Sequence, residues 1–394
     1  MTKRNLIITF GGVSPEHEVS VLTGIQCVSV LKETDFNLIP LYITKTGQWF
    51  TGSNLLELES FKDLKKIEKE SIPCYITTNE TGSAVLKENK KGFLSNNQNH
   101  VIDTVLTAFH GSSGENGSFQ GLCEMFNIPY TGSGVKASAI GMDKIAAKNL
   151  CRDAKIPVVE GINFNERKWI EDSKYLVSSA ESLDYPVVVK PVSLGSSIGV
   201  SIVNNRDELK NSIETAFRYD ANLLVEKAIS PLIEINCSVL GSAVNCRASI
   251  CERPVGKDEL LSFRDKYQSE GDGKGMASAD RIIPADIKPE LAEKIQETAC
   301  SVFALFGCSG VARLDFLVNS ETDQIYFNEI NTIPGSFSFY LWKESGLDFK
   351  TLLSEMINIA KEEHRKKNGR IQSYDTNLLS EKAVKGIKGL KNSK

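Results

Sequence analysis

Three oxygen-bearing side chains in the last third of the sequence give the clearest indication of chemistry. Asp315 lies in the apolar segment VARLDFLV, and Glu329 and Asn331 lie in QIYFNEIN, with a short turn between the two segments. Alternation along a strand puts Arg313 with Asp315 on one face, and Glu329 with Asn331 on one face. If the two strands pair, the three side chains converge as hard oxygen ligands of the kind that Mg²⁺ prefers. The sequence therefore predicts a magnesium site, and two such ions can bridge the oxygens of ATP.

The competing interpretation of these two segments is a charged strand face open to solvent, which is common in antiparallel sheets. The apolar neighbours of Asp315 and Glu329 indicate burial instead. Because buried carboxylates need partners, we rank the metal site above the solvated face.

Two lysines on either side of a glycine- and serine-rich loop are suited to binding phosphate. Lys144 follows GMD, and Lys190 ends the run VVVK before the loop GSSIG, which begins at Gly195. The backbone N–H groups and hydroxyls of such a loop, including Ser196 and Ser197, can bind an anion. A single lysine is more often a solvated surface charge, and the loop alone is a weak signal. No GxxxxGK[ST] motif occurs, so any phosphate site differs from a Walker loop.

Polar residues also follow two expected strands, at the edge where open α/β sheets bind ligands. Glu16 lies in SPEHE after the first strand, and His110 begins HGSSGENG after another. Glu16 can hold a substrate ammonium, or it can belong to a helix start whose carboxylates favour the helix dipole. His110 is either a ligand-edge residue or a hydrogen-bonded structural histidine. The sequence leaves both pairs of alternatives open.

An open parallel α/β sheet is the fold expected for the first domain, residues 1–140, because apolar strands alternate there with a glycine turn and a helix. Within it, the polar stretch 51–100 is predicted to be a surface insertion with a helix and a hairpin. The other expected elements are strands at 6–10, 38–44 and 101–108 and a helix at 19–31.

The rest of the chain is predicted to form two α+β lobes and a charged tail. We expect a small lobe at 141–228, a larger lobe at 229–365 and a lysine-rich tail at 366–394. A polar loop at 262–281 has no periodic pattern, which is typical of a functional cover or a disordered segment. The expected elements are helices at 144–154, 209–217, 289–306 and 349–366, and strands at 186–190, 200–203, 222–226, 235–240, 248–255, 311–318 and 324–331.

The composition favours a soluble enzyme with small-molecule partners. The chain has 394 residues, enough for two to three domains, with 46 basic and 50 acidic residues and a net charge of -4. This balance gives no electrostatic reason to expect nucleic acid or an anionic membrane as a partner. No apolar run approaches the roughly twenty residues of a membrane span. The nine cysteines show no CxxC spacing, which indicates reduced thiols in the cytoplasm.

Seven segments, in their order along residues 4–362, resemble the D-alanine–D-alanine ligase family. They are FGGVSPEHEVS, HGSSGENGSFQG, IPYTGSGVKASAIGMDK, VVVKPVSLGSSIGV, LLVEKAI, GVARLDF and NEINTIPGS. The resemblance implies an N-terminal α/β domain followed by an ATP-grasp fold, with ATP and two Mg²⁺ ions, or Mn²⁺ in their place, between its two lobes. It also implies a homodimer.

By matching position, the resemblance assigns ATP-binding and metal-binding roles to residues already noted and to several others. The implied phosphate contacts are Lys144, Lys190 and Ser197, the adenine pocket is Glu226, Lys227, Ala228 and Ile229, the ribose contact is Glu234, and the metal ligands are Asp315, Glu329 and Asn331.

The resemblance also implies the family's reaction and, by matching position, the residues that take part in it. ATP phosphorylates the carboxylate of one D-alanine, and the amine of a second D-alanine attacks the acyl phosphate. The implied residues are Glu16 for the first ammonium, Ser196 to orient Glu16, Arg313 and the Gly335 N–H for the oxyanion, Lys266 for the transferred phosphate, and Tyr267 to close over the first subsite.

The sequence departs from the family after Pro334-Gly335, where it continues SFSFYLW. The serine that would contact the second amino acid is either Ser336 or Ser338. This departure keeps open a ligase with another second substrate, such as D-serine, D-lactate or a different amine. Two further alternatives are a nucleotide-binding protein without ligase activity and a nicotinamide dehydrogenase, the latter resting only on the N-terminal strand, GG and helix.

Overall fold

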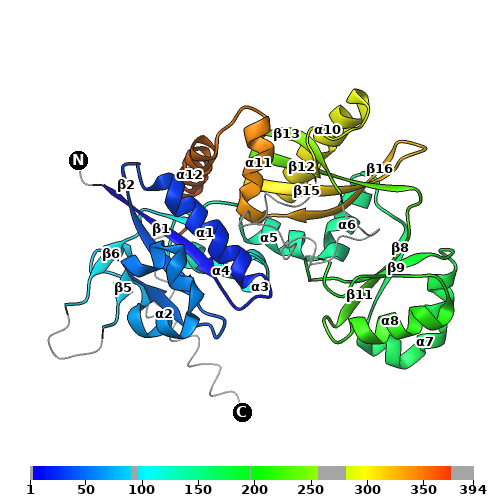
Figure 1. The fold of residues 1–394 in the computed structure, drawn as a ribbon, viewed down its shortest axis with the longest axis horizontal. Coiled ribbons are helices and arrows are strands. Elements are labelled where there is room, and N and C mark those ends of the chain that lie inside the picture. The colour runs from blue at the N-terminus through cyan, green and yellow to red at the C-terminus, as the bar shows by residue number, and fades with distance from the viewer. Residues whose placement is uncertain (1–2, 91–95, 196, 256–280, 374–394) are drawn as a thin grey trace, which may run out of the picture. The chain divides into compact units, whose positions relative to one another are not determined.

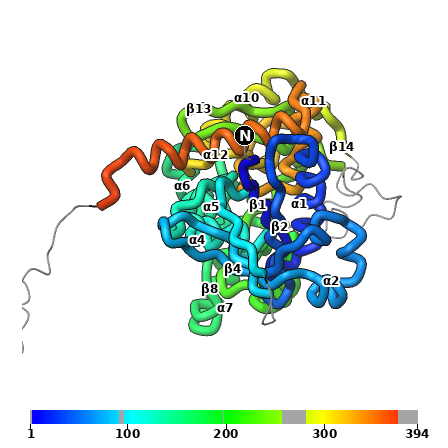
Figure 2. Tube along the Cα trace, turned by 90° about the vertical axis from the view of Figure 1, so that its left-hand side faces the viewer, coloured from blue at the N-terminus to red at the C-terminus, as the bar shows by residue number. Residues whose placement is uncertain are grey.

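The computed structural model describes residues 3–90, 96–195, 197–255 and 281–373. The chain divides into two compact units, Met1–Lys361 and Glu362–Lys394. The first unit contains three β-sheets, and the described part of the second consists of the end of helix α12 (Phe349–Asn368) and residues 369–373. Figures 1 and 2 show the elements in two views.

Three parallel strands form the centre of the first domain. Strand β1 (Arg4–Gly11) pairs with β2 (Phe36–Ile43) on one side and with β7 (Thr104–Thr107) on the other. Leu6, Ile7 and Ile8 are fully buried, so both faces of β1 are covered, as in parallel sheets generally. Helix α1 (His17–Leu31) makes the crossover from β1 to β2 (Figure 1). The elements predicted here from the sequence are confirmed.

The helix and the hairpin predicted within the insertion at 51–100 are present. The insertion is more than the surface segment that we predicted, because its strands extend this sheet. The strands here pair antiparallel with their neighbours, so the seven-stranded sheet is mixed rather than parallel throughout. Cys74, Ala84 and Leu86 are buried against the domain core. The elements are β3 (Trp49–Thr51), η1 (Ser53–Leu56), η2 (Leu58–Lys62), α2 (Leu64–Glu70), β4 (Ile72–Thr78), β5 (Ala84–Glu88) and β6 (Asn99–Val101).

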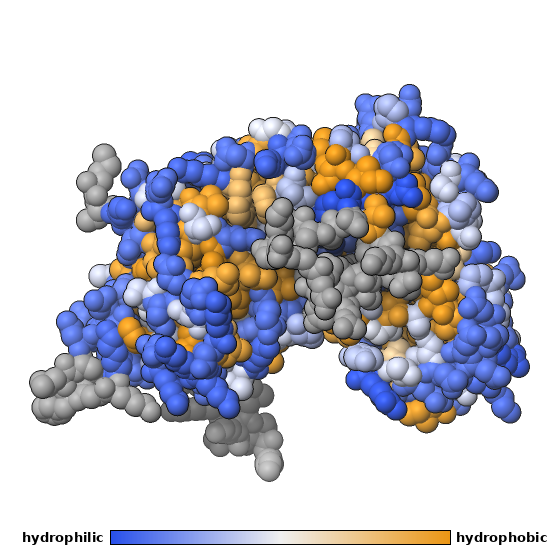
Figure 3. Space-filling model, in the orientation of Figure 1, coloured by the Kyte–Doolittle hydropathy of each residue, from blue (hydrophilic) through white to orange (hydrophobic). Residues whose placement is uncertain are grey.

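The small lobe is a four-stranded antiparallel sheet in the order β10-β9-β11-β8. The predicted hairpin around the glycine-rich loop is confirmed, because β9 (Val187–Pro191) pairs with β10 (Ser201–Val203). Its buried core contains Val187 and Val189 of β9 and residues of the helices, whose outer surface is largely hydrophilic in Figure 3. The other elements are β8 (Gly161–Asn165), α7 (Glu166–Glu181), α8 (Arg206–Ala216) and β11 (Asn222–Lys227).

The large lobe is built on a five-stranded antiparallel sheet covered by helix α10 (Pro289–Phe306). This helix begins with a proline and ends at Gly307, which is left-handed, and it buries Ile295, Val302 and Phe303. The elements of the sheet are β12 (Leu232–Ser242), β13 (Asn245–Pro254), β14 (Arg281–Ile282), β15 (Ser309–Asn319) and β16 (Gln324–Asn331).

Helix α6 (Lys144–Asp153), which we counted with the small lobe, packs into the core of the large lobe. Its Ala147 and Cys151 belong to the same buried cluster as Phe303 of α10 and Phe327 of β16. Helix α6 therefore contributes to the large lobe. The domain boundaries predicted after residues 140, 228 and 365 stay a proposal. The remaining elements are α3 (Ser112–Glu115), α4 (Ser118–Met125), α5 (Val135–Met142), η4 (Gly335–Ser338) and α11 (Phe339–Glu344). No helix in the described parts of the chain is long and apolar enough to cross a membrane.

Candidate active site

The predicted pairing of β15 with β16 is confirmed, and it brings the acidic residues together. Asp315 lies opposite Glu329, and Arg313 lies opposite Asn331. Arg313 donates from Nε and Nη2 to the two carboxylate oxygens of Asp315, each at 2.7 Å, and Asn331 Nδ2 donates to Asp315 at 3.2 Å. Burial alone would lower the pKa of Arg313, but the Asp315 carboxylate raises that pKa well above its ordinary value. Arg313 is therefore a fixed cation at this strand face.

Lys144 connects this strand face to the glycine-rich loop. Asp143 caps α6 by accepting from the N–H groups of Ile145 and Ala146, both at 2.9 Å, which places Lys144 in the first turn. The Lys144 ammonium lies 3.2 Å from a carboxylate oxygen of Glu329 and donates to the carbonyl of Leu194 at 2.6 Å. A phosphate bound against the loop would thus meet Lys144 beside the acidic pair.

The residues of this face fit a hard divalent cation. Two carboxylates that oppose each other across paired strands repel unless a positive charge lies near, and here Arg313 and Lys144 supply it. In the parts of the chain that the structure describes, no group of three or more His, Cys, Asp and Glu side chains could hold a metal. An ion here would therefore rely on Asp315, Glu329, the amide oxygen of Asn331 and oxygens from outside the protein, the pattern usual for Mg²⁺.

Asn328 joins the site through an irregularity that the sequence did not reveal. The register of β15 and β16 shifts between Asp315 and Phe316, which leaves Asn328 as an extra residue on β16. Its side-chain oxygen accepts from Lys190 Nζ at 3.2 Å. Strict alternation of side chains cannot place such a residue.

A buried cluster of two lysines and a glutamate lies between β9, β11 and α6. Lys190 Nζ donates to one oxygen of Glu226 at 2.7 Å, and Lys148 Nζ donates to the other. Burial alone would raise the pKa of Glu226, but the two ammonium groups lower that pKa to about 2. Burial lowers the pKa of Lys148 to about 8, against the opposing effect of Glu226. Lys148 was missed in the sequence, although its spacing of four residues from Lys144 puts both on one helix face.

The segment after Glu226 connects the two lobes. The N–H of Lys227 donates to Glu160 O and that of Ala228 to Pro186 O, both at 3.0 Å. Glu226 and Lys148 also line a cavity of about 280 Å³ beside this segment. The adenine contacts from Lys227 to Ile229 and the ribose contact from Glu234 stay predictions.

Glu16 approaches the glycine-rich loop from the first domain. A Cβ atom added to Gly195 would lie 3.8 Å from Glu16 Oε2, and one added to Gly111 would lie 2.6 Å from it. Gly111 also has a φ of +68°, a left-handed conformation that favours glycine. The neighbouring His17 is structural, because its Nδ1–H donates to Gly12 O at 2.8 Å and its Nε2 accepts from Tyr42 at 3.1 Å.

Three of the predicted residues, Ser196, Lys266 and Tyr267, lie outside the described residues. Ser197 follows in the loop with a left-handed φ of 58°, and the N–H of Ile198 donates to Gly195 O at 3.2 Å. The phosphate-binding role of this loop stays a prediction.

The segment after Gly335 forms a left-handed turn. Ser336, Phe337 and Ser338 have φ values of 48°, 53° and 50°, which non-glycine residues rarely adopt. All three are buried, and Ser338 Oγ has no hydrogen-bond partner among the described residues. Neither serine is thereby identified as the contact to a second amino acid.

Tyr340, in the same segment, belongs to a buried polar cluster near Arg313. Glu252 is 2% exposed and accepts from Tyr340 Oη at 2.8 Å, from Asn236 Nδ2 at 3.1 Å and from Arg281 Nη1 at 3.1 Å. The guanidinium of Arg281 lies over the Tyr340 ring, 4.1 Å from its centroid. Burial and the Glu252 carboxylate both raise the pKa of Tyr340, so its hydroxyl stays protonated. The periodicity of side chains in the sequence did not predict this cluster.

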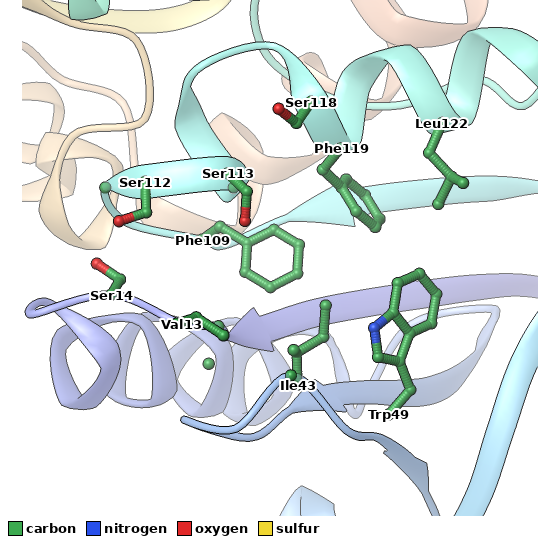
Figure 4. A pocket seen from close by; sticks show the side chains of 15 residues that line it. Val13, Ser14, Ile43, Trp49, Phe109, Ser112, Ser113, Ser118, Phe119 and Leu122 are labelled. Carbon is green, nitrogen blue, oxygen red and sulfur yellow. The ribbon is translucent and has the colours of Figure 1, made fainter. Parts of the chain in front are cut away.

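A further cavity of about 280 Å³ lies at the carboxyl ends of β1, β2 and β7, with Ser14 at its border (Figure 4). Figure 4 shows Trp49, Phe109 and Phe119 directed into it. Its lining consists of glycine, serine and apolar residues and contains no charged side chain. The nine cysteines are free thiols, seven of them buried, and none contributes to the acidic face.

Comparisons with known proteins agree with this arrangement. A sequence profile described as D-ala D-ala ligase N-terminus matches residues 5–133, and one described as D-ala D-ala ligase C-terminus matches residues 150–358. A D-alanine–D-alanine ligase from Thermosipho melanesiensis is 40% identical over 381 residues, covering 97% of this chain and 99% of that relative. Another from Caldicellulosiruptor bescii is 36% identical over 377 residues, covering 93% and 98%.

Solved structures resemble this one over nearly its whole length. The D-alanine–D-alanine ligase from Coxiella burnetii has a TM-score of 0.77 and 27% identity, covering 94% of this chain and 97% of its own. The VanG D-Ala:D-Ser ligase from Enterococcus faecalis has a TM-score of 0.76 and 29% identity, covering 91% and 99%. The architecture is accordingly an N-terminal α/β domain followed by the two lobes of an ATP-grasp fold. With both halves matched and relatives aligned along almost all of its length, the chain belongs to the D-alanine–D-alanine ligase family.

Proposed function

We propose that this chain joins two D-alanine molecules to D-alanyl-D-alanine at the expense of ATP, for the synthesis of peptidoglycan precursors. The observation that carries the proposal is the face of β15 and β16, where Arg313, Asp315, Glu329 and Asn331 meet beside Lys144. This set combines an oxyanion-binding cation, metal-binding oxygens and a phosphate-binding lysine. Its relatives at up to 40% identity carry the corresponding name.

In the first step, a carboxylate oxygen of one D-alanine attacks the γ-phosphorus of ATP, and ADP leaves. Glu16 would bind the ammonium of this D-alanine, with Ser196 orienting Glu16, and Lys144, Lys190 and Ser197 would hold phosphate oxygens. Two Mg²⁺ ions, or Mn²⁺ in their place, would neutralise charge on the phosphates when bound to Asp315, Glu329 and Asn331. The adenosine would lie against Glu226, Lys227, Ala228, Ile229 and Glu234.

In the second step, the amine of another D-alanine attacks the acyl carbon and a C–N bond forms. The bond from the acyl carbon to the phosphate oxygen breaks, phosphate leaves with the bonding electrons, and it takes up the proton that the nitrogen loses. The tetrahedral intermediate carries a negative oxygen, which Arg313 and the Gly335 N–H would stabilise. Lys266 would contact the transferred phosphate and Tyr267 would close over the first subsite. The protein thus contributes mainly positioning and charge stabilisation rather than proton transfer.

A second candidate is the same chemistry with another acceptor, D-serine, D-lactate or a different amine. It is favoured by the segment SFSFYLW, which forms a left-handed turn and carries Tyr340 near Arg313. The similarity to a D-Ala:D-Ser ligase, with a TM-score of 0.76, also keeps this candidate open.

The test is phosphate release from ATP and Mg²⁺ with D-alanine alone, and with D-alanine together with L-alanine, D-serine or D-lactate, each product being identified by mass. D-alanyl-D-alanine as the main product supports the proposal. A mixed product formed faster than the D-alanine dipeptide would replace it by the second candidate. Absence of any D-alanine-dependent turnover would refute both.

We further propose that the chain acts as a homodimer in the cytoplasm. The scattered, reduced cysteines and the net charge of -4 support a cytoplasmic enzyme with small-molecule partners and without nucleic acid or membrane. Sedimentation of the purified chain measures the oligomeric state.

A further inference from the structure

The first domain holds the loop that carries Gly335 through hydrogen bonds to both the N–H and the C=O of Ile333. Ile333 N–H donates to Glu115 Oε1 at 3.0 Å. Ile333 O accepts from His110 Nδ1 at 2.8 Å. More than two hundred residues of sequence separate the partners, so both contacts depend on the tertiary fold.

Thr23 completes the network. A carbonyl oxygen only accepts, so His110 carries its proton on Nδ1 and its Nε2 is an acceptor. The Thr23 hydroxyl, 2.8 Å away, therefore donates to Nε2, and its oxygen accepts from Ser336 N–H at 3.1 Å. Burial lowers the pKa of His110 to about 4, which keeps the ring neutral as this arrangement requires. Thr23 is fully buried and His110 is 3% exposed, so water does not compete for these bonds.

The two anchored residues lie on either side of Gly335. Ile333 precedes it by two positions and Ser336 follows it directly, so the first domain holds the peptide groups on both sides of the one that carries the Gly335 N–H. The left-handed turn at Ser336, Phe337 and Ser338 is intrinsically unfavourable for residues that carry a Cβ atom. Such a conformation persists only where the surroundings determine it, and backbone strain of this kind is typical of functional sites.

The same network reaches the Glu16 side of the site. Glu115 Oε2 accepts from Gly111 N–H at 3.0 Å, and Gly111 is the residue whose added Cβ would clash with Glu16 and Ser14. One buried carboxylate thus holds both the backbone beside Glu16 and the backbone beside Gly335.

We propose that Thr23, His110 and Glu115 are positioning residues that hold the Gly335 N–H where the oxyanion of the tetrahedral intermediate forms. This inference rests on the proposed ligase function. It extends the role of the first domain from binding the first amino acid to shaping the site in which the acyl group is attacked. None of the three residues needs to touch substrate for this role.

The test compares T23V with T23S and with the wild-type chain. Valine has the shape of threonine but leaves His110 Nε2 and Ser336 N–H without their partner, whereas serine keeps the hydroxyl. We expect T23V to lower kcat at saturating ATP and D-alanine by about tenfold, with KM for ATP changed less than about twofold, because the effect falls on the intermediate. T23S should restore kcat to within about twofold of wild type.

The matched control is T51V. Thr51 is another buried threonine of the first domain, and its hydroxyl donates to Pro40 O at 2.7 Å without contacting the Gly335 loop. Loss of the Thr51 hydroxyl in T51V should lower thermal stability as T23V does, but leave kcat unchanged. A kcat of T23V within twofold of wild type, an impaired T23S, or an equal kcat loss in T51V would overturn the proposal.

Hydrogen exchange separates this inference from the proposed function. Mass spectrometry of peptides that cover Ile333 to Tyr340 should show exchange about tenfold faster in T23V than in wild type or T51V, because the Ser336 N–H loses its acceptor. If the wild-type chain has no D-alanine-dependent turnover, the proposed function and the oxyanion role both fail, while faster exchange would still establish the anchor. Unchanged exchange in T23V would refute the anchor itself.

Discussion

Asp315 on β15 lies directly opposite Glu329 on β16, and each carboxylate has its own basic partner. Arg313 pairs with Asp315 from the same strand, whereas Lys144 reaches Glu329 from the start of α6. The acidic pair is therefore held between two cations of different origin. Arg313 and Lys144 already offset the negative charge of the acidic pair, and a bound metal ion would add further positive charge.

We expect E329Q to abolish turnover without unfolding the protein. Glutamine keeps the size of the side chain but removes the charge that would bind a metal, so kcat should fall by about a hundredfold or more. The Mg²⁺ concentration for half-maximal activity should rise in the same variant. Phosphate release at varied Mg²⁺ measures both effects.

The matched control for this variant is E321Q, an exposed glutamate in the turn between the same two strands. It should behave as wild type. If E329Q retained more than a tenth of wild-type kcat, Glu329 would not be a metal ligand.

Lys148 should matter for both stability and ATP binding, although it was not predicted from the sequence. The substitution K148M leaves Glu226 with Lys190 alone inside the protein, and an incompletely paired buried charge costs about 2–4 kcal/mol. We expect that loss in the free energy of unfolding, together with a higher KM for ATP, because Lys190 and Glu226 would shift. Urea denaturation and steady-state kinetics provide the two measurements.

The comparison for K148M is K32M, which removes a surface pair with Glu57 whose side chains are 49% and 63% exposed. Exposed pairs contribute little, so this variant should change the free energy of unfolding by less than about 1 kcal/mol. Equal losses in the free energy of unfolding for K148M and K32M would contradict the stabilising role of Lys148 in the buried cluster.

Glu115 should make stability fall as pH rises. Burial and the charge of Glu16 raise the pKa of Glu115 from 4.5 to about 7 in the folded protein. The folded state therefore holds this proton more tightly than the unfolded chain, and the stabilisation is complete below pH 4.5 and is lost as pH rises through 7. Such a shift corresponds to about 3 kcal/mol.

The variant E115Q cannot ionise at this position, so it isolates that contribution. The free energy of unfolding of wild type minus that of E115Q should decrease by about 3 kcal/mol between pH 4.5 and 7, since the titration of His110 is common to both proteins. A flat difference for E115Q would show that the Glu115 pKa is not raised.

Tyr340 should stabilise the fold through Glu252. The substitution Y340F removes one of three donors to a buried carboxylate and leaves Asn236 and Arg281 in place. We expect a loss of about 1–3 kcal/mol in the free energy of unfolding, measured by urea denaturation. Y175F, at a tyrosine that is 66% exposed, should lose less than about 0.5 kcal/mol. A neutral Y340F would mean that Glu252 is satisfied by its other partners.

Much of the architecture follows from local patterns in the sequence. The alternation in 311–318 and 324–331 predicted a strand pair with Arg313, Asp315, Glu329 and Asn331 brought together, and that pairing is present. The helix at 289–306 and the hairpin around the glycine-rich loop were also predicted, because their side-chain periods and turn residues lie within a few positions of one another. The roles of the site residues stay predictions.

Other features depended on contacts that no local pattern encodes. The insertion at 51–100 became part of the first sheet, and Asn328 entered the site through a register shift. Lys148 shows only a helical spacing in the sequence, while its partner Glu226 lies 78 residues away. The same holds for Glu115 and Ile333, which are 218 residues apart.

The elements, the family resemblance and the residue types that could bind phosphate and metal were predictable, because these depend on neighbouring positions along the chain. The pairing of charges, and the contacts by which Thr23, His110 and Glu115 hold the Gly335 loop, became visible only in the folded structure. Hydrogen bonds and ion pairs act over about 3 Å, so they form only after folding has brought distant segments together.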